Sequence, residues 1–242
     1  MYEEFMGTKP VAERQKVDIG ALADYVRKHI GNFDGDLQIE QFKGGQSNPT
    51  FKLTAGNASY VLRTKPAPAA KLLPSAHAID REYRVMDALS KAGFPAARQY
   101  ALCEDESVIG RAFYIMEFMD GRVLWDQSLP GMSTADRAAH YDEMNRVIAQ
   151  LHSIDYRAIG LETYGKPGNY FGRQIDRWTR QYKASETELI PAMEQLIEWL
   201  PQNIPAGEMT TIVHGDYRLD NMIFHPTEPR ILAVLDWELS TL

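Results

Sequence analysis

Two short stretches near the end of the chain decide how its fold is interpreted. Residues 213–221 read Val-His-Gly-Asp-Tyr-Arg-Leu-Asp-Asn, and residues 232–238 read Leu-Ala-Val-Leu-Asp-Trp-Glu. Asp216 and Asn221 lie five residues apart in the first stretch, and Asp236 directly follows an apolar run in the second. Phosphoryl transfer uses such groups, because one carboxylate orients the attacking hydroxyl while a carboxylate and an amide oxygen hold Mg²⁺. Together, in this order, the two stretches indicate phosphotransferase chemistry.

The same stretches resemble the aminoglycoside phosphotransferase and choline kinase family. Residues 214–221 are similar to the protein-kinase loop H-R-D-x-x-x-x-N, and residues 236–238 resemble the metal-binding D-F-G segment. The resemblance implies that Asp216 is the catalytic base and that Asn221 and Asp236 are Mg²⁺ ligands. It also implies a protein-kinase-like fold with a nucleotide bound between two lobes.

The rest of the chain has the pattern of an α+β protein with two lobes. Alternating apolar and polar residues predict strands at 37–42, 50–54, 60–63, 97–102 and 111–118, with short strands at 211–213, 221–225 and 231–235. Helical spacing predicts helices at 18–30, 77–92, 133–152, 169–183 and 186–200. We therefore expect a five-stranded antiparallel sheet plus a helix in the N-lobe and a mainly helical C-lobe. The predicted parts are an N-terminal arm and helix (1–32), a nucleotide-binding N-lobe (33–118) and a catalytic C-lobe (119–242).

A glycine-rich turn between the first two strands is the predicted phosphate-covering loop. Gly45 allows the backbone to approach phosphate closely, and Ser47 and Asn48 can donate hydrogen bonds. A plain hairpin turn is the alternative interpretation.

The third strand ends with two cations on one face, Arg63 and Lys65. Either could contact the α- and β-phosphates, and the resemblance aligns Arg63 with the family's usual Lys. Glu82 is the candidate carboxylate that pairs with this cation, with a solvent-facing position as the alternative. Glu117 and Met119 mark the linker whose backbone would bind the nucleotide base.

A basic helical face at 169–182 carries Arg173, Arg177 and Arg180. It could meet an anionic substrate such as a CoA moiety, or it could be a solvated face. This segment and residues 60–65 resemble the kinase-like domain fused to some acyl-CoA dehydrogenases, whose branch is associated with hydroxylated acyl-CoA substrates.

Composition excludes several classes of partner. The net charge of −7 argues against nucleic-acid binding. The sequence contains no run of about 18 apolar residues, so no membrane span is predicted. One cysteine, Cys103, rules out a disulfide within the chain and fits the reducing cytoplasm.

The resemblance covers roughly residues 33–242, and relatives continue past the metal-binding Asp with further helices. The sequence ends six residues after Asp236, so we expect an incomplete C-lobe and an exposed apolar patch.

The predicted function is a Mg²⁺-dependent kinase that moves the γ-phosphoryl of ATP or GTP to a small-molecule hydroxyl. A hydroxyacyl-CoA and an aminoglycoside-like compound are the candidate acceptors. A catalytically inactive nucleotide-binding module is the alternative. A two-metal phosphoesterase would need more clustered carboxylates or histidines. The oligomeric state stays open.

Overall fold

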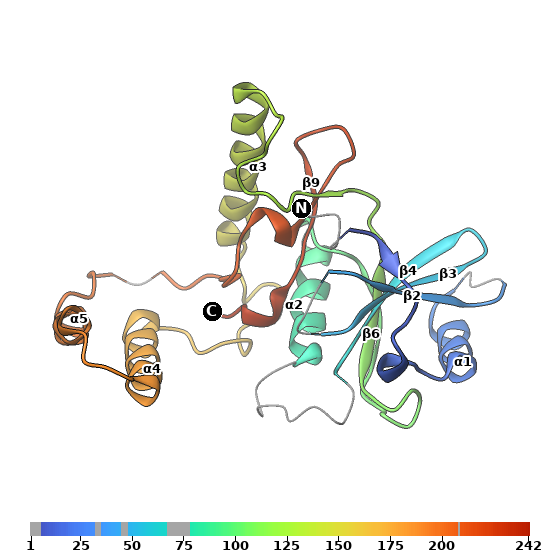
Figure 1. The fold of residues 1–242 in the computed structure, drawn as a ribbon, viewed down its shortest axis with the longest axis horizontal. Coiled ribbons are helices and arrows are strands. Elements are labelled where there is room, and N and C mark those ends of the chain that lie inside the picture. The colour runs from blue at the N-terminus through green and yellow to red at the C-terminus, as the bar shows by residue number, and fades with distance from the viewer. Residues whose placement is uncertain (1–5, 32–34, 45–47, 67–77, 208) are drawn as a thin grey trace.

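A six-stranded antiparallel sheet forms the first lobe (Figure 1). In the computed structural model, which describes residues 6–31, 35–44, 48–66, 78–207 and 209–242, the strand order is β1-β2-β3-β4-β6-β5. The strands are β1 (Thr8–Lys9), β2 (Gln38–Phe42), β3 (Thr50–Ala55), β4 (Ala58–Thr64), β5 (Gln99–Cys103) and β6 (Phe113–Glu117). Five of them were predicted. The sixth, β1, comes from the arm, where a two-residue strand followed by a 3₁₀ turn (Glu13–Gln15) is too short to produce an alternating pattern.

Helices cover the sheet on both faces, α1 (Ile19–His29) on one and α2 (Ile79–Lys91) on the other. Neighbouring residues of β4 point to opposite faces, so Leu62 packs in the cluster with α1 while Val61 packs in the cluster with α2. The α2 cluster continues into the second lobe and includes Trp237. Helix α2 therefore belongs to the core of both lobes.

The second lobe combines α3 (Thr134–Ser153) with a small sheet of order β7-β8-β9. Its strands are β7 (Arg122–Val123), β8 (Met222–Phe224) and β9 (Ile231–Val234), and 3₁₀ turns at Leu219–Asn221 and Trp237–Leu239 flank them. Strand β7 was not predicted because it has two residues. The strand predicted at 211–213 is wrong, because this segment forms only an isolated bridge between Val213 and Thr241.

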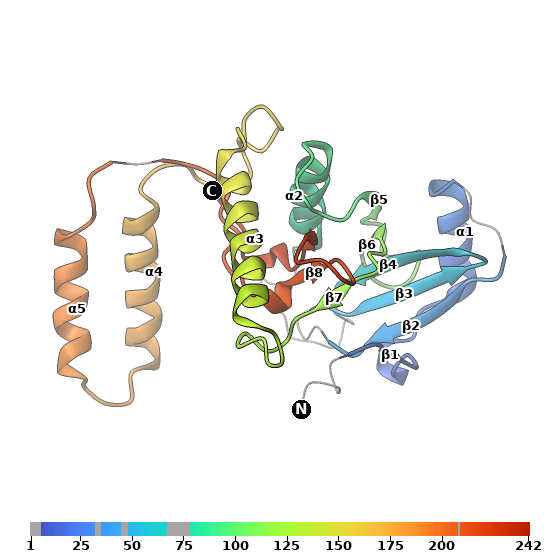
Figure 2. The same cartoon turned by 90° about the horizontal axis from the view of Figure 1, so that it is seen from above.

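Helices α4 (Tyr170–Ser185) and α5 (Pro191–Gln202) form a hairpin that projects away from both lobes (Figure 2). Neither helix has a buried residue, and Phe171, Trp178 and Trp199 are exposed. These side chains form exposed apolar surface on the hairpin, and the patch expected where further helices would follow Asp236 stays a prediction. No helix in the described ranges is both long enough and apolar enough to cross a bilayer.

The lobes meet at the linker that follows β6 and along α2. A Cβ at Gly121 would lie 2.4 Å from the Phe224 carbonyl oxygen, so glycine allows the linker to cross β8 closely. From α2, Arg81 donates to the carbonyl oxygens of Tyr164 (2.7 Å) and Ser240 (3.2 Å). These contacts connect α2 to the loop after α3 and to the segment that follows Asp236.

Candidate active site

The loop before β8 places Asp216 and Asn221 side by side. The side-chain amide of Asn221 donates to the main-chain oxygen of Asp216 (2.9 Å) and to its carboxylate Oδ2 (2.8 Å). Because both donations come from the Asn221 nitrogen, the orientation of the amide is fixed and its oxygen is left as an acceptor. The loop therefore presents a carboxylate and an amide oxygen together, and their roles as base and metal ligand stay predictions.

Asp236 lies beside this loop at the end of β9. The main-chain nitrogen of Leu235 donates to the Asn221 carbonyl oxygen at 2.8 Å, which brings the end of β9 next to the loop. Asp236 has a φ of 62°, in the left-handed region that Asp tolerates better than most non-glycine residues. The three residues named by the two sequence motifs thus come together at one edge of the second lobe.

His214 links the loop before β8 to the end of β9 by two hydrogen bonds. Its Nδ1 accepts from the main-chain nitrogen of Asp216 (3.2 Å), so its Nε2 carries the proton and donates to the Leu235 carbonyl oxygen (2.8 Å). The ring is buried and meets the ring of Trp237 edge to face at 4.6 Å. Burial lowers the pKa of His214 below its ordinary value. These contacts give His214 a structural place between the loop and the end of β9.

A pH-dependent stability follows from this buried neutral imidazole. The unfolded chain binds a proton at His214 near pH 6.5, whereas the folded protein binds it only at lower pH. The contribution of neutral His214 to the free energy of unfolding is therefore complete above about pH 6.5. It is lost as the pH falls through the folded pKa. We expect the urea midpoint of the wild type to fall more steeply between pH 7.5 and pH 5.5 than that of His214→Gln. Equal slopes for the two proteins would contradict this account.

Arg63 at the end of β4 joins the two lobes by charge. Its Nε lies 2.7 Å from Glu82 Oε2, and its Nη2 lies 3.0 Å from Asp236 Oδ1. Burial acts to lower the pKa of Arg63, but Tyr114, Glu82 and Asp236 outweigh it and raise the pKa above the ordinary value. Lys65 is half-buried and makes no ion pair with any residue that the structure describes. Of the two cations predicted to contact phosphate, Arg63 is the one that pairs with other candidate site residues.

Glu82 is buried rather than solvent-facing. Only 1% of its side chain is exposed, and Asn48 Nδ2 donates to its Oε1 (2.8 Å) while the Tyr114 hydroxyl donates to its Oε2 (2.9 Å). Burial, together with Glu82, raises the pKa of Tyr114 well above its ordinary value, so its hydroxyl stays a donor. Tyr114 was not among the residues predicted for the site. The available signal was its place in the sheet, because Tyr114 is the register partner of Arg63.

The remaining predicted nucleotide contacts are only partly described. Gly45 and Ser47 lie outside the described residues. Asn48 is buried with its side-chain amide on Glu82, instead of pointing outward from the turn. In the linker, the Glu117 carboxylate accepts from the main-chain nitrogen of Arg98 (3.3 Å), and Met119 packs against the core. A base contact by this backbone stays a prediction.

Two of the three arginines on the basic face of α4 make contacts with residues close to them in the sequence. Arg173 donates to the carbonyl oxygens of Gly168 and Lys166, and Arg180 pairs with Asp176 at 2.6 Å. These contacts favour the interpretation as a solvated and locally paired face over a site for an anionic substrate.

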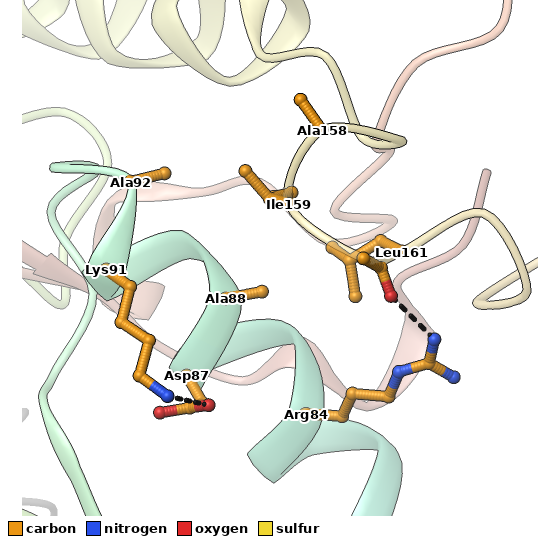
Figure 3. Close-up of a pocket in the computed structure, with 9 residues that line it drawn as sticks. Arg84, Asp87, Ala88, Lys91, Ala92, Ala158, Ile159 and Leu161 are labelled. Atoms are coloured by element: carbon orange, nitrogen blue, oxygen red, sulfur yellow. Dashed lines mark hydrogen bonds and ion pairs between the residues drawn. The ribbon is translucent and has the colours of Figure 1, made fainter.

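A separate open cavity of about 480 Å³ lies between α2 and the loop after α3 (Figure 3). Its lining comprises Arg84, Asp87, Ala88, Lys91, Ala92 and residues 158–161. Arg84 crosses it to donate to the Gly160 carbonyl oxygen at 2.7 Å. On a helix with 3.6 residues per turn, Arg84 and its neighbours in this cavity lie on the face of α2 opposite Glu82. The cavity is therefore distinct from the candidate active site.

The sequence of this chain is similar to those of known proteins. Residues 38–242 match the model of the "Phosphotransferase enzyme family". Mouse acyl-CoA dehydrogenase family member 10 is 49% identical over 236 residues, which are 97% of this chain and 22% of that protein. The chain thus spans about a fifth of the relative's length. This match confirms the predicted relationship to a domain found in acyl-CoA dehydrogenase family proteins.

Solved structures confirm the predicted kinase-like fold. The crystal structure of a candidate aminoglycoside phosphotransferase from Ralstonia eutropha is 66% identical, has a TM-score of 0.85, and covers 93% of this chain and 66% of its own. A ternary complex of streptomycin, ATP and APH(2″)-IIa is 19% identical with a TM-score of 0.60, covering 93% of this chain and 72% of its own. At that identity the second likeness concerns the fold alone.

Proposed function

Because the chain belongs to the phosphotransferase enzyme family, we propose that it is a small-molecule kinase that moves the γ-phosphoryl of ATP or GTP to a substrate hydroxyl. The observation that carries the proposal is the meeting of Asp216, Asn221 and Asp236 at one edge of the second lobe, with Arg63 reaching them from the first. These are a base, two oxygen ligands and a cation, which phosphoryl transfer requires.

Asp216 acts on the acceptor hydroxyl in this proposal. Its carboxylate is held by Asn221 through Oδ2, so one oxygen is fixed and the other can take the hydroxyl's hydrogen bond. A hydroxyl oriented in this way attacks the γ-phosphorus in line and passes its proton to Asp216. Positioning and electrostatic stabilisation supply most of the rate increase in this proposal.

The oxygen donors beside Asp216 fit Mg²⁺. Among the described residues, no three His, Cys, Asp or Glu side chains cluster in a way that could hold a metal alone. Mg²⁺ differs from such metals, because it keeps several waters and phosphate oxygens and needs only one or two protein ligands. The amide oxygen of Asn221 and the carboxylate of Asp236 would hold it, and the ion would neutralise charge on the β- and γ-phosphates.

The nucleotide would lie between the lobes. The turn at 44–48 covers the phosphates, Arg63 or Lys65 offsets the charge of the α- and β-phosphates, and the backbone at 117–119 binds the base. The shared fold of the ATP complex described above supports this placement. A buried, free Cys103 supports a location in the reducing cytoplasm.

Two acceptor classes are proposed, because the relatives point in different directions. The name of the mouse relative mentions acyl-CoA, and that of the Ralstonia relative mentions an aminoglycoside. A kinase needs a hydroxyl to phosphorylate, so the acyl-CoA candidate is a hydroxylated one. The paired arginines of α4 give no independent support for a CoA moiety.

A direct assay tests the proposal. The protein is incubated with Mg²⁺ and ATP or GTP, together with a 4-hydroxyacyl-CoA, the matching acyl-CoA without the hydroxyl, or an aminoglycoside. We expect nucleoside diphosphate and a product heavier by one phosphoryl group, detected by mass spectrometry, only with a hydroxylated acceptor. Stabilisation by nucleotide without transfer to any acceptor would indicate a binding module. An absence of nucleotide binding would overturn the proposal.

A further inference from the structure

We propose that Tyr114 and Asn48 are positioning residues that hold Glu82, and through it Arg63, in the orientation that serves the nucleotide phosphates. This inference rests on the proposed function and extends it to two side chains that would not touch the nucleotide. It begins from the unusually complete set of contacts around one buried carboxylate.

Both oxygens of Glu82 are held by residues from different parts of the first lobe. Asn48, two residues before β3 begins, donates to Oε1 at 2.8 Å. Tyr114 of β6 donates to Oε2 at 2.9 Å, and Arg63 of β4 lies 2.7 Å from the same oxygen. Glu82, Asn48 and Tyr114 are each about 1% exposed. A Glu side chain has several rotatable bonds, and these added donors restrict it to one orientation of the carboxylate.

The orientation of that carboxylate controls where Arg63 points. A guanidinium is planar, so two contacts with Glu82 together restrict how it can turn: the ion-pair contact of Nε with Oε2 (2.7 Å) and the long hydrogen bond from Nη2 to Oε1 (3.5 Å). In this orientation Nη2 reaches Asp236 at 3.0 Å, across the boundary between the lobes. A rotation of Glu82 would therefore turn the guanidinium away from the site. Asn48 adds a second link, since it joins the predicted phosphate-covering turn to the same carboxylate.

The hydroxyl of Tyr114 is not needed for packing. Its ring lies in the apolar cluster that α2 shares with the sheet, where a phenylalanine would fill almost the same volume. Tyr156 lies in the same cluster and is also buried, but its hydroxyl has no hydrogen-bond partner among the residues that the structure describes. The two tyrosines therefore differ in what the hydroxyl contacts, and Tyr156→Phe is a matched control for Tyr114→Phe.

A double-mutant cycle on nucleotide binding tests the proposal. Dissociation constants for ATP with Mg²⁺, and for adenosine, are measured by calorimetry on the wild type, Tyr114→Phe, Glu82→Gln and the double variant. Asn48→Ala and Tyr156→Phe are measured in parallel. We expect Tyr114→Phe to weaken ATP binding by about tenfold, the scale of one lost hydrogen bond to a charged group. Adenosine binding should stay within twofold of the wild type, because adenosine has no phosphate.

Three results would support the inference. In the Glu82→Gln background, Tyr114→Phe should weaken ATP binding little further, because the hydroxyl acts through that carboxylate. Asn48→Ala should weaken ATP but not adenosine, and Tyr156→Phe should bind both as the wild type does. Additive effects, equal weakening of adenosine, or wild-type ATP affinity in Tyr114→Phe would overturn this inference and leave the proposed function standing. A wild type that binds neither ATP nor GTP would overturn both.

Discussion

Asp216→Asn is expected to lower the rate of phosphoryl transfer by about 10²- to 10⁴-fold, the usual contribution of a general base. The substitution keeps the size of the side chain and an oxygen that can accept from Asn221, so the loop should keep its shape. It removes the group that takes the proton of the acceptor hydroxyl. Nucleotide affinity should change little, because Asp216 is not among the predicted phosphate contacts. Initial rates with the acceptor found in the screen, and calorimetry with ATP and Mg²⁺, measure the two quantities.

Asp220→Asn is the matched control on the same loop. The Asp220 carboxylate accepts from Gln127 at 3.0 Å and pairs with Arg218, so it has a structural place without a role in the proposed chemistry. We expect its turnover to stay close to that of the wild type. Near-normal turnover in Asp216→Asn would remove its assignment as the base. An equal loss in both variants would mean that the loop is simply disturbed.

Trp237→Ala is expected to destabilise the protein by about 3–5 kcal/mol, the range for deleting a large buried aromatic side chain. Trp237 is 1% exposed and packs edge to face against His214 (4.6 Å) and Phe94 (5.8 Å). Its indole nitrogen donates to the Val234 carbonyl oxygen at 3.0 Å. The residue therefore holds β9, the loop before β8 and the segment after α2 together. Urea unfolding followed by circular dichroism measures the change.

Two variants separate packing from a general effect of removing tryptophan. Trp237→Phe keeps an aromatic ring at the position where the kinase D-F-G segment has phenylalanine, and should recover most of the lost stability. Trp178→Ala removes an indole that is 62% exposed on α4, and should change the free energy of unfolding by about 0.5 kcal/mol or less. A small effect of Trp237→Ala would contradict the central packing role described here.

Much of the fold could be predicted because its signals are local. Asp18 begins α1 and Ser133 begins α3 through side-chain caps, and both helices start where the sequence indicated. The longer strands show period-two alternation. Strands β1 and β7 have two residues each and exist only because a longer neighbour pairs with them. Their formation depends on tertiary contacts, which leave no periodic pattern in the sequence.

The residues of the candidate site also fall into those that could be predicted from local sequence and those that could not. Asp216, Asn221 and Asp236 could be named because their type and spacing carry the chemistry. Tyr114 could not, since a tyrosine within an apolar strand has the same pattern whether its hydroxyl meets a carboxylate or nothing. The direction of Asn48 depends on how α2 packs against the sheet, which decides whether an amide at the turn meets Glu82 or solvent. Contacts between distant segments determine these positions.

The distribution of tryptophan gives the protein a built-in optical probe. Trp178 and Trp199 are 62% and 56% exposed on the α4–α5 hairpin, whereas Trp237 is enclosed beside Asp236. A dissolved quencher such as iodide will suppress emission from the hairpin more than emission from Trp237 and from the half-buried Trp125. In a Trp125→Phe variant, changes in the remaining shorter-wavelength emission will then report events next to Asp236 without any attached dye.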